Sequence, residues 1–76
     1  MKIGDKVRLV KLPTWLHQLP VLSQNIFHHC LYGVFDITAI EEGVLVLDVS
    51  WLVDNKFGGW RNDIRVEPEY VIKEQP

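Results

Sequence analysis

The segment Gly4-Asp5-Lys6-Val7-Arg8-Leu9-Val10 opens the chain, and the segment Ile64-Arg65-Val66-Glu67-Pro68-Glu69-Tyr70-Val71 lies near its end. In both segments apolar and charged residues alternate, which is the pattern of a strand with one buried face. A breaker marks each strand, because Gly4 precedes the first and Pro68 follows the second. Together they look like the two terminal strands of a small closed barrel.

The length of 76 residues predicts one domain spanning residues 1–76. A single core of this size supplies about 3–5 kcal/mol of stability unless a partner covers one face. Cys30 is the one cysteine, so no disulfide forms within the chain, and a lone thiol suits a reducing compartment. The first residues show no apolar leader, and no apolar run approaches the roughly 18 residues of a membrane span. We therefore expect a cytoplasmic protein with no membrane contact.

Charge and aromatic content narrow the function classes. The formal net charge is −2, which argues mildly against nucleic acid as the partner, since proteins that bind it usually carry a basic excess. A hydrophobic content of 47% predicts a folded chain. Three tryptophans are many for this length, and tryptophan is enriched in interfaces.

A helical insertion is expected after the first strand, over residues 13–33. Residues 13–20 are too apolar for a free loop and predict a turn or short helix packed on the sheet. Residues 21–32 predict a helix that begins at Ser23 or already at Pro20 and ends before Gly33, placed where a helix C′ residue belongs. Its buried face is predicted to hold Leu22, Ile26, Phe27, Cys30 and Leu31.

The remaining chain reads as strands. Their predicted ranges are 5–11, 34–40, 44–50, 61–66 and 71–73. Their predicted inward residues are Val7, Leu9, Phe35, Ile37, Leu45, Leu47, Val49, Ile64 and Val66. Glu41-Glu42-Gly43 predicts a tight hairpin turn. Residues 51–60 fit no element clearly: Val53 is taken to extend the strand, Gly58-Gly59 to form a hinge or bulge, and residues 74–76 to form a frayed tail.

This order of elements resembles an SH3-like barrel. The turn Pro68-Glu69-Tyr70-Val71 is similar to the proline and Tyr-Val turn that leads into the last strand of Src-homology-3 domains, although it is one residue shorter. Gly4-Asp5-Lys6-Val7-Arg8 resembles the first strand of SH3-like modules such as the variable chain of ferredoxin–thioredoxin reductase, the stromal barrel subunit of photosystem I and KOW-type RNA-binding domains. The resemblance implies a mostly-β fold, a five-stranded SH3-like barrel with a helical insertion after the first strand.

The insertion departs from the Src-homology-3 pattern. Residues 13–33 are helical where those domains have an irregular hairpin loop, and the acidic cluster of that loop is missing. The aromatic run of their first strand is missing too. Recognition of proline-rich peptides is therefore not implied.

Aromatic residues spread over several connections are the main functional lead. In an SH3-like barrel such residues converge on one face and line a shallow groove. The resemblance thus implies a partner-binding groove formed by Trp15, Phe57, Trp60, Arg61, Pro68 and Tyr70. The alternative is that several aromatic residues enlarge the small core, with Trp15 and Trp51 expected inside and Phe57 and Trp60 expected outside.

Catalytic and metal-binding patterns are weak. His17, His28, His29 and Cys30 supply metal-ligand types, but neighbours on a helix point about 100° apart and rarely reach one ion. Cys30 is expected to be a buried, inert thiol rather than a nucleophile. The carboxylates are scattered, and no phosphate loop or catalytic triad pattern is present. We expect no cofactor, no metal and no enzymatic activity.

Two functions from different classes follow. The first is a protein-interaction module, free-standing or an accessory subunit, with a protein partner. The second is a nucleic-acid-binding barrel of KOW type, using a basic stripe of Lys6, Arg8, Arg61 and Arg65 beside Trp60. In the alternative view of that stripe, its charges pair with Asp36, Asp48, Asp63 and Glu67. A third hypothesis, an accessory subunit of a photosynthetic or redox complex, rests on the resemblance.

A homodimer is also considered, because several apolar residues are predicted on the outer face of the sheet. They are Val10, Val34, Ile40, Val44 and Val46. Either the 13–33 insertion or a second copy is expected to cover them.

Overall fold

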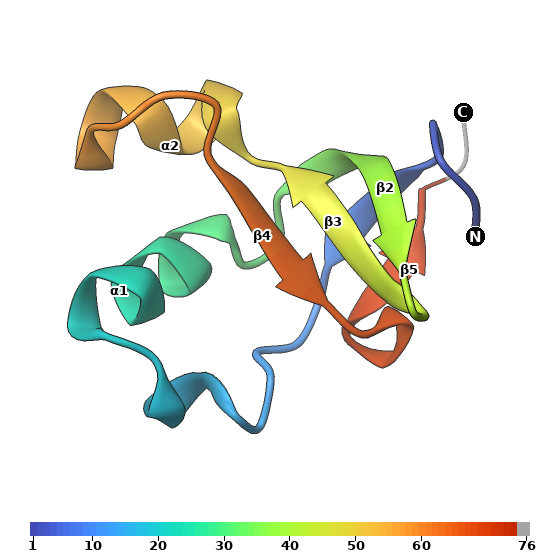
Figure 1. Ribbon diagram of the computed structural model, residues 1–76, viewed down its shortest axis with the longest axis horizontal. Helices are drawn as coiled ribbons and strands as arrows, with labels where there is room; N and C mark the ends of the chain where they lie inside the picture. Colours follow the sequence, from blue (N-terminus) through green and yellow to red (C-terminus); the bar gives the residue numbers. More distant parts are fainter. Residues whose placement is uncertain (75–76) are drawn as a thin grey trace.

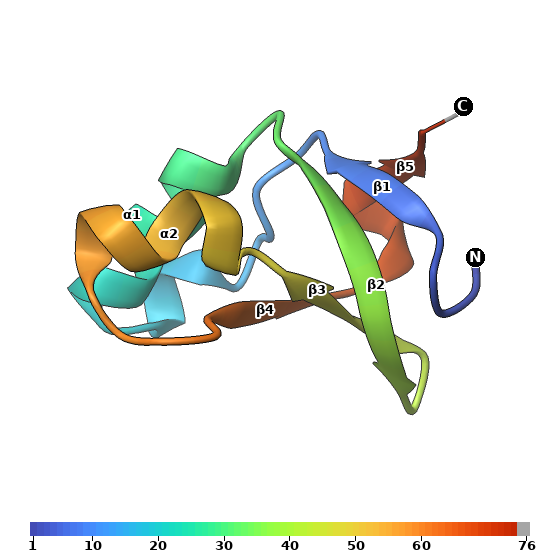
Figure 2. The ribbon, with the colours of Figure 1, turned by 90° about the horizontal axis from the view of Figure 1, so that it is seen from above.

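The structure, a computed structural model, describes residues 1–74 and shows a small, mostly-β domain. Its strands are β1 (Lys6–Leu9), β2 (Val34–Glu41), β3 (Val44–Asp48), β4 (Asp63–Val66) and β5 (Val71–Lys73). Its helices are α1 (Val21–Cys30) and α2 (Ser50–Phe57), with single 3-10 turns η1 (Leu16–Gln18) and η2 (Pro68–Tyr70). The two α-helices lie side by side at one end of the sheet (Figures 1 and 2).

The strands form one antiparallel sheet in the order β4-β3-β2-β1-β5. Within residues 1–74, β4 and β5 pair with one neighbour each and not with one another, so the sheet is open. The prediction of a closed barrel is therefore not met. Pro68, which lacks an N–H, starts the 3-10 turn η2 two residues after Val66, the last residue of β4, and this turn carries the chain from one edge of the sheet to the other.

The predicted hairpin is confirmed, with Glu42 and Gly43 as its two loop residues. Both have positive φ, +52° and +80°, which defines the type I′ turn that suits the twist of paired strands. The register of the β2–β3 pair shifts between Ile37 and Ala39, which marks an irregularity in the longest strand.

Helix α2 replaces the strand extension predicted for Val53. Val49, Val53 and Phe57 recur every fourth residue, so they lie on one helix face, where Val53 is fully buried. The Asp48 carboxylate accepts hydrogen bonds from the Ser50 N–H at 2.9 Å and the Ser50 hydroxyl at 2.6 Å, which fixes the start of the helix. Gly58, with φ +81°, ends it, so the Gly58-Gly59 pair terminates a helix rather than bending a strand.

Helix α1 begins directly after Pro20, the earlier of the two predicted starts, and ends at Cys30, two residues before the predicted end. Tyr32, with φ +70°, takes the left-handed position expected of Gly33. Gly33 is needed for close packing instead, because a Cβ there would lie 2.6 Å from a ring carbon of Phe35. Leu22, predicted on the buried face, is exposed.

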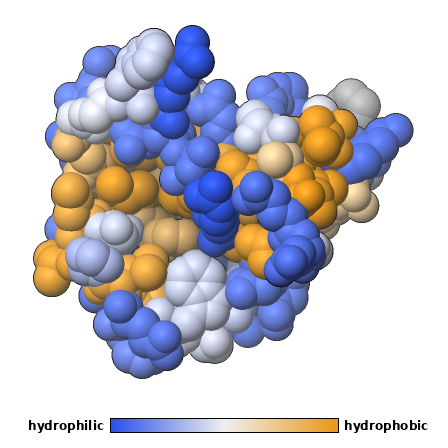
Figure 3. All heavy atoms as spheres, viewed as in Figure 1, coloured by the Kyte–Doolittle hydropathy of each residue, from blue (hydrophilic) through white to orange (hydrophobic). Residues whose placement is uncertain are grey.

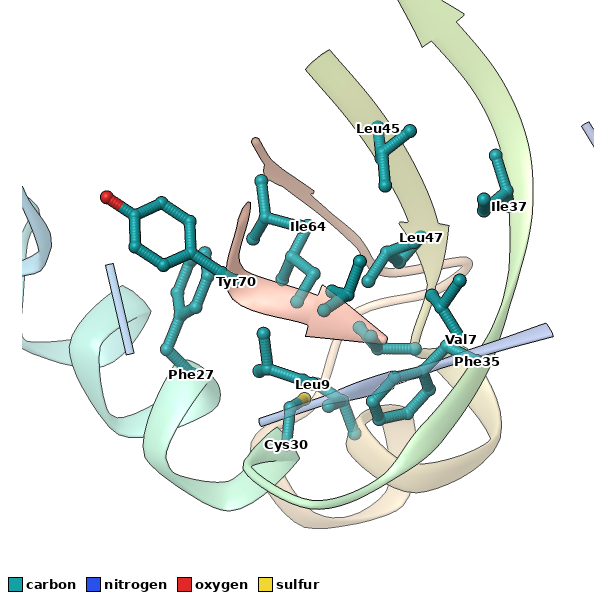
Figure 4. Close-up of a cluster of buried hydrophobic side chains, with 14 of the residues drawn as sticks. Val7, Leu9, Phe27, Cys30, Phe35, Ile37, Leu45, Leu47, Ile64 and Tyr70 are labelled. Carbon is teal, nitrogen blue, oxygen red and sulfur yellow. The ribbon is translucent and has the colours of Figure 1, made fainter. Parts of the chain in front are cut away.

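The core fills the space between the inner face of the sheet and the two helices (Figure 4). All nine residues predicted to point inward from the strands are buried. Phe27 and Cys30 of α1 point into the same cluster (Figure 4). Val46, on the outer face, is buried too. Ile40 was predicted on the outer face, but the register shift pairs it with the inward residue Leu45, so it lies on the inner side of the sheet, where it is exposed.

Strands β1 and β4 are shorter than predicted. Strand β1 spans four residues and β4 begins at Asp63, so Arg61 lies in the preceding loop. The tail prediction is wrong for Glu74, whose N–H donates to the Lys6 carbonyl at 2.9 Å, while residues 75 and 76 lie outside the described residues. Among residues 1–74 there is no helix with the length and apolar character needed to cross a bilayer.

Candidate functional site

A groove of about 300 Å³ runs between α1 and the edge strand β4. Its residues from the insertion are Trp15, Leu19, Ser23, Ile26 and Phe27. Its residues from the strand side are Asn62, Asp63, Ile64 and Arg65. Figure 3, in the orientation of Figure 1, shows hydrophobic residues on the α1 side of β4 and a strongly hydrophilic stripe over the strand itself. The groove is thus apolar on one wall and polar on the other.

Trp15 forms a fixed part of the apolar wall. Its indole N–H donates to both carboxylate oxygens of Glu67, each at 3.0 Å. Its ring meets Phe27 edge to face, with centroids 5.7 Å apart. Because Glu67 directly follows β4, this contact joins the insertion to the end of the strand beside the groove.

The polar wall is the open edge of the sheet. The Val49 N–H donates to the Asn62 carbonyl, and the antiparallel register pairs Leu47 with Ile64. Since hydrogen-bonded pairs alternate along such a ladder, Asn62 and Ile64 direct their backbone groups toward β3. Asp63 and Arg65 direct theirs away from it, and within residues 1–74 these groups make no backbone hydrogen bond.

The side chains of β4 alternate in the opposite sense. Ile64 and Val66 point into the core, whereas Asp63 and Arg65 are exposed on the outer face. The Arg65 guanidinium lies 3.3 Å from Glu41 and 3.5 Å from Asp63. The edge therefore presents one negative and one positive side chain beside its free backbone groups.

A second cluster lies at the end of α2, in the loop before β4. The Arg61 guanidinium stacks on the Trp60 ring at 4.3 Å, and Trp60 is 77% exposed. The Asp54 carboxylate accepts hydrogen bonds from the N–H groups of Arg61 (3.0 Å) and Asn62 (3.3 Å) and from the Asn62 amide (2.6 Å). Partial burial opposes ionisation of Asp54, but these hydrogen bonds outweigh it and lower its pKa.

A polar cavity of about 340 Å³ adjoins this loop. It is lined by Thr38, Asp48, Ser50, Arg61, Asn62 and Asp63. Its carboxylates are engaged within the protein, since Asp48 accepts from Ser50 and Asp63 contacts Arg65.

The six predicted partner-binding residues lie at several separate places in the fold. Trp15 lines the apolar groove, and Pro68 is exposed on the turn that follows Glu67. Tyr70 is a core residue, 5% exposed, with its hydroxyl 3.3 Å from the Thr14 hydroxyl. Phe57 is half-buried against the His29 ring, and Trp60 with Arg61 lies in the loop after α2.

One expectation about tryptophan was wrong. Trp51 was expected in the core but is 64% exposed, because it projects from α2 away from the face that carries Val49 and Val53. Trp15, also expected to enlarge the core, is half-buried and packs against the core cluster. Leu19, Ile26 and Ile64 were not predicted as site residues. The insertion holds more apolar residues than one face of the sheet can cover, and this excess was the signal that could have indicated a binding surface.

The other chemistry-bearing residues have structural surroundings. Cys30 is fully buried, and burial raises the pKa of its thiol to about 11, which keeps it protonated. Among residues 1–74, no three histidine, cysteine or carboxylate side chains gather closely enough to hold a metal ion. Of the predicted basic stripe, Lys6 pairs with Asp36 at 2.8 Å and Arg8 with Glu74 at 2.7 Å.

Comparison with known proteins returned no match to a family model, to a curated protein or to a solved structure. The geometry of the groove and of the open edge is therefore the basis on which function is proposed.

Proposed function

We propose that this chain is a protein-interaction module, free-standing or an accessory subunit, that holds a segment of a partner protein in the groove between α1 and β4. The observation that carries the proposal is an apolar groove placed directly against an unpaired strand edge. Apolar side chains with a few polar groups at the rim are typical of protein-binding surfaces. The Trp15–Glu67 hydrogen bonds support the proposal, because they hold the groove open before any partner arrives.

We also propose that the fold is an open variant of the SH3-like architecture. Two features support this class: β1 lies between β2 and β5, and a 3-10 turn containing Pro68 and Tyr70 leads into the last strand. The helical insertion then occupies the position of the long first loop and adds α1 as one wall of the groove.

A second candidate function is binding of single-stranded nucleic acid by the loop after α2. The exposed Trp60 ring, with Arg61 stacked on it, supports this candidate, since bases stack on such aromatic faces. It is weaker than the first, because Lys6, Arg8 and Arg65 are each engaged by a carboxylate.

An affinity capture from extract of the cell of origin tests the first proposal, with two variants of α1. Ser23→Arg places a long side chain in the groove, whereas Asn25→Arg adds the same charge at an exposed position of the same helix outside it. We expect one protein to be retained by the wild type and by Asn25→Arg and to be lost with Ser23→Arg, and direct binding of the purified pair must show the same order.

Two outcomes contradict the proposal. Equal retention by both variants places the partner elsewhere on the molecule. Retention that nuclease treatment abolishes assigns the binding to nucleic acid, and Trp60→Ala then removes it.

A further inference from the structure

We infer that the partner segment adds to β4 as an extended, antiparallel strand, with apolar residues facing α1 and a basic and an acidic residue opposite Asp63 and Arg65. This inference rests on the proposed function and names the kind of segment that the same groove accepts. It belongs to the class of recognition in which a peptide extends a sheet at its open edge.

The backbone of the edge supplies the first reason. Asp63 and Arg65 each present an N–H and a carbonyl to the groove side of β4, with no backbone partner within residues 1–74. Only an extended chain satisfies donors and acceptors spaced at every second residue. The antiparallel direction continues the arrangement of all the other neighbours in this sheet.

The shape of the groove supplies the second reason. Residues that lie directly opposite each other in an antiparallel pair project from the same face. A residue opposite Ile64 therefore projects inward, toward Leu19, Ile26 and Phe27, where the groove offers about 300 Å³. Its neighbours along the strand project outward, so the groove selects an alternating segment with large apolar residues at every second position.

Charge supplies the third reason. On the outer face, a residue opposite Asp63 meets a carboxylate, and the residue opposite Arg65 meets a guanidinium. Opposite charges in directly facing positions favour pairing, and like charges oppose it. The preferred sequence of the partner segment, read from its N-terminal end, is therefore apolar–acidic–apolar–basic–apolar.

The β4 strand of a second copy satisfies the charge rule, since Asp63 would face Arg65 in a symmetric pair. It does not fill the apolar groove, because its inward residue, Ile64, is 6% exposed and already packed in its own core. A separate partner with a free apolar side chain is thus the better occupant, and self-association is an outcome of the test.

The probe is the peptide acetyl-Ser-Leu-Glu-Leu-Lys-Leu-Ser-amide, titrated into the ¹⁵N-labelled chain and followed by NMR. We expect the amides of Asp63 and Arg65 to shift and to gain protection from hydrogen exchange. A peptide with Glu and Lys exchanged is the matched control and should bind about fivefold more weakly. Methylating the backbone nitrogens of Glu and Lys removes the donors that face β4 and should weaken binding by about tenfold or more.

Two proline variants test the edge from the protein side. Arg65→Pro removes a free N–H and a cation from β4, and Lys73→Pro does the same on β5, where Val71 and Lys73 face the open edge opposite β4. Binding should be lost with Arg65→Pro and unchanged with Lys73→Pro, with both folds checked by circular dichroism.

The inference fails if N-methylation leaves the affinity unchanged, if neither peptide binds, or if labelled chain alone sediments as a dimer that Arg65→Pro separates. In each of these cases the proposed function still stands if Ser23→Arg abolishes capture of the native partner. If that capture is also insensitive to Ser23→Arg, the groove itself is not the binding site and both proposals fall.

Discussion

At Trp15 a single indole N–H joins two parts of the chain that lie far apart in sequence. The hydrogen bonds to Glu67 are charge-assisted and partly buried, so each partner needs the other. Removing the carboxylate leaves a half-buried indole N–H without its acceptor and loosens the wall of the groove.

The variant Glu67→Ala should lower the free energy of unfolding by about 1–2 kcal/mol, the cost of losing one partner of a partly buried, charged hydrogen bond. Glu69→Ala is the matched control, since Glu69 lies in the same turn with an exposed side chain. It should stay within about 0.5 kcal/mol of the wild type. Urea unfolding measures both, and equal effects would show that the Trp15 contact adds nothing to stability.

Single residues were predictable from sequence where one periodicity governed them. Val7 and Ile37 each lie between two polar neighbours and are buried as expected. Trp51 was not predictable in this way, because its exposure depends on whether residues 50–57 are a strand or a helix. On a helix it lies about 200° around from Val49, which turns it to solvent.

Among the elements, the β2–β3 hairpin carries a strained residue. Glu42 has φ +52°, in the left-handed region where a residue with a Cβ is disfavoured by roughly 1–2 kcal/mol. Asparagine tolerates this region better, and Asn-Gly is the preferred pair for a type I′ turn.

Glu42→Asn should therefore raise the free energy of unfolding by about 0.5–1 kcal/mol. Glu42→Gln is its control, because it removes the same charge without the preference of asparagine for positive φ, and it should change stability little. Thermal or urea unfolding of the three proteins decides the point. A gain shared by both variants would assign the effect to charge instead of backbone conformation.

Helix α2 shows why one element escaped prediction. Leu45, Leu47 and Val49 continue the period of two that defines β3, so the sequence favours a longer strand. Val49 is also the first residue of a helical period with Val53 and Phe57. At the transition the Asp48 carboxylate accepts hydrogen bonds from the Ser50 N–H and hydroxyl, and this local hydrogen bonding is not visible in a pattern of apolar residues.

For the whole molecule, the number of strands and their succession along the chain were predictable, but whether the sheet closes into a barrel was not. Alternation identifies β4 and β5 separately, whereas their pairing depends on how the turn between them is oriented in space. The groove shares this limit, because α1 and β4 meet through tertiary packing. In the sequence Ile26 appears as a core residue and Arg65 as an unrelated surface residue, although both line the groove.

Three carboxylates of the fold have a lowered pKa: Asp5 and Glu74 near the two ends of the described chain, and Asp54 in α2. The backbone N–H of Lys2 lowers the pKa of Asp5, and the Arg8 guanidinium, donating at 2.7 Å, lowers the pKa of Glu74. The hydrogen bonds from Asn62 and Arg61 lower the pKa of Asp54 despite its partial burial. Each group binds a proton more readily in the unfolded chain, whose reference values are 3.8 for aspartate and 4.5 for glutamate.

Stability from these groups is therefore present above the unfolded values and is lost as the pH falls through the folded ones. We expect the free energy of unfolding to be nearly constant from pH 7 to about 5 and to decrease steadily below about 4.5, as protons bind preferentially to the unfolded chain. Urea unfolding across this range measures the slope. Glu74→Gln should flatten it, because the amide cannot ionise beside Arg8, whereas Glu69→Gln should leave its shape unchanged. A wild-type curve with no acid slope, or one that Glu74→Gln does not alter, would show that the Arg8–Glu74 pair between β1 and the residue after β5 contributes nothing to folding.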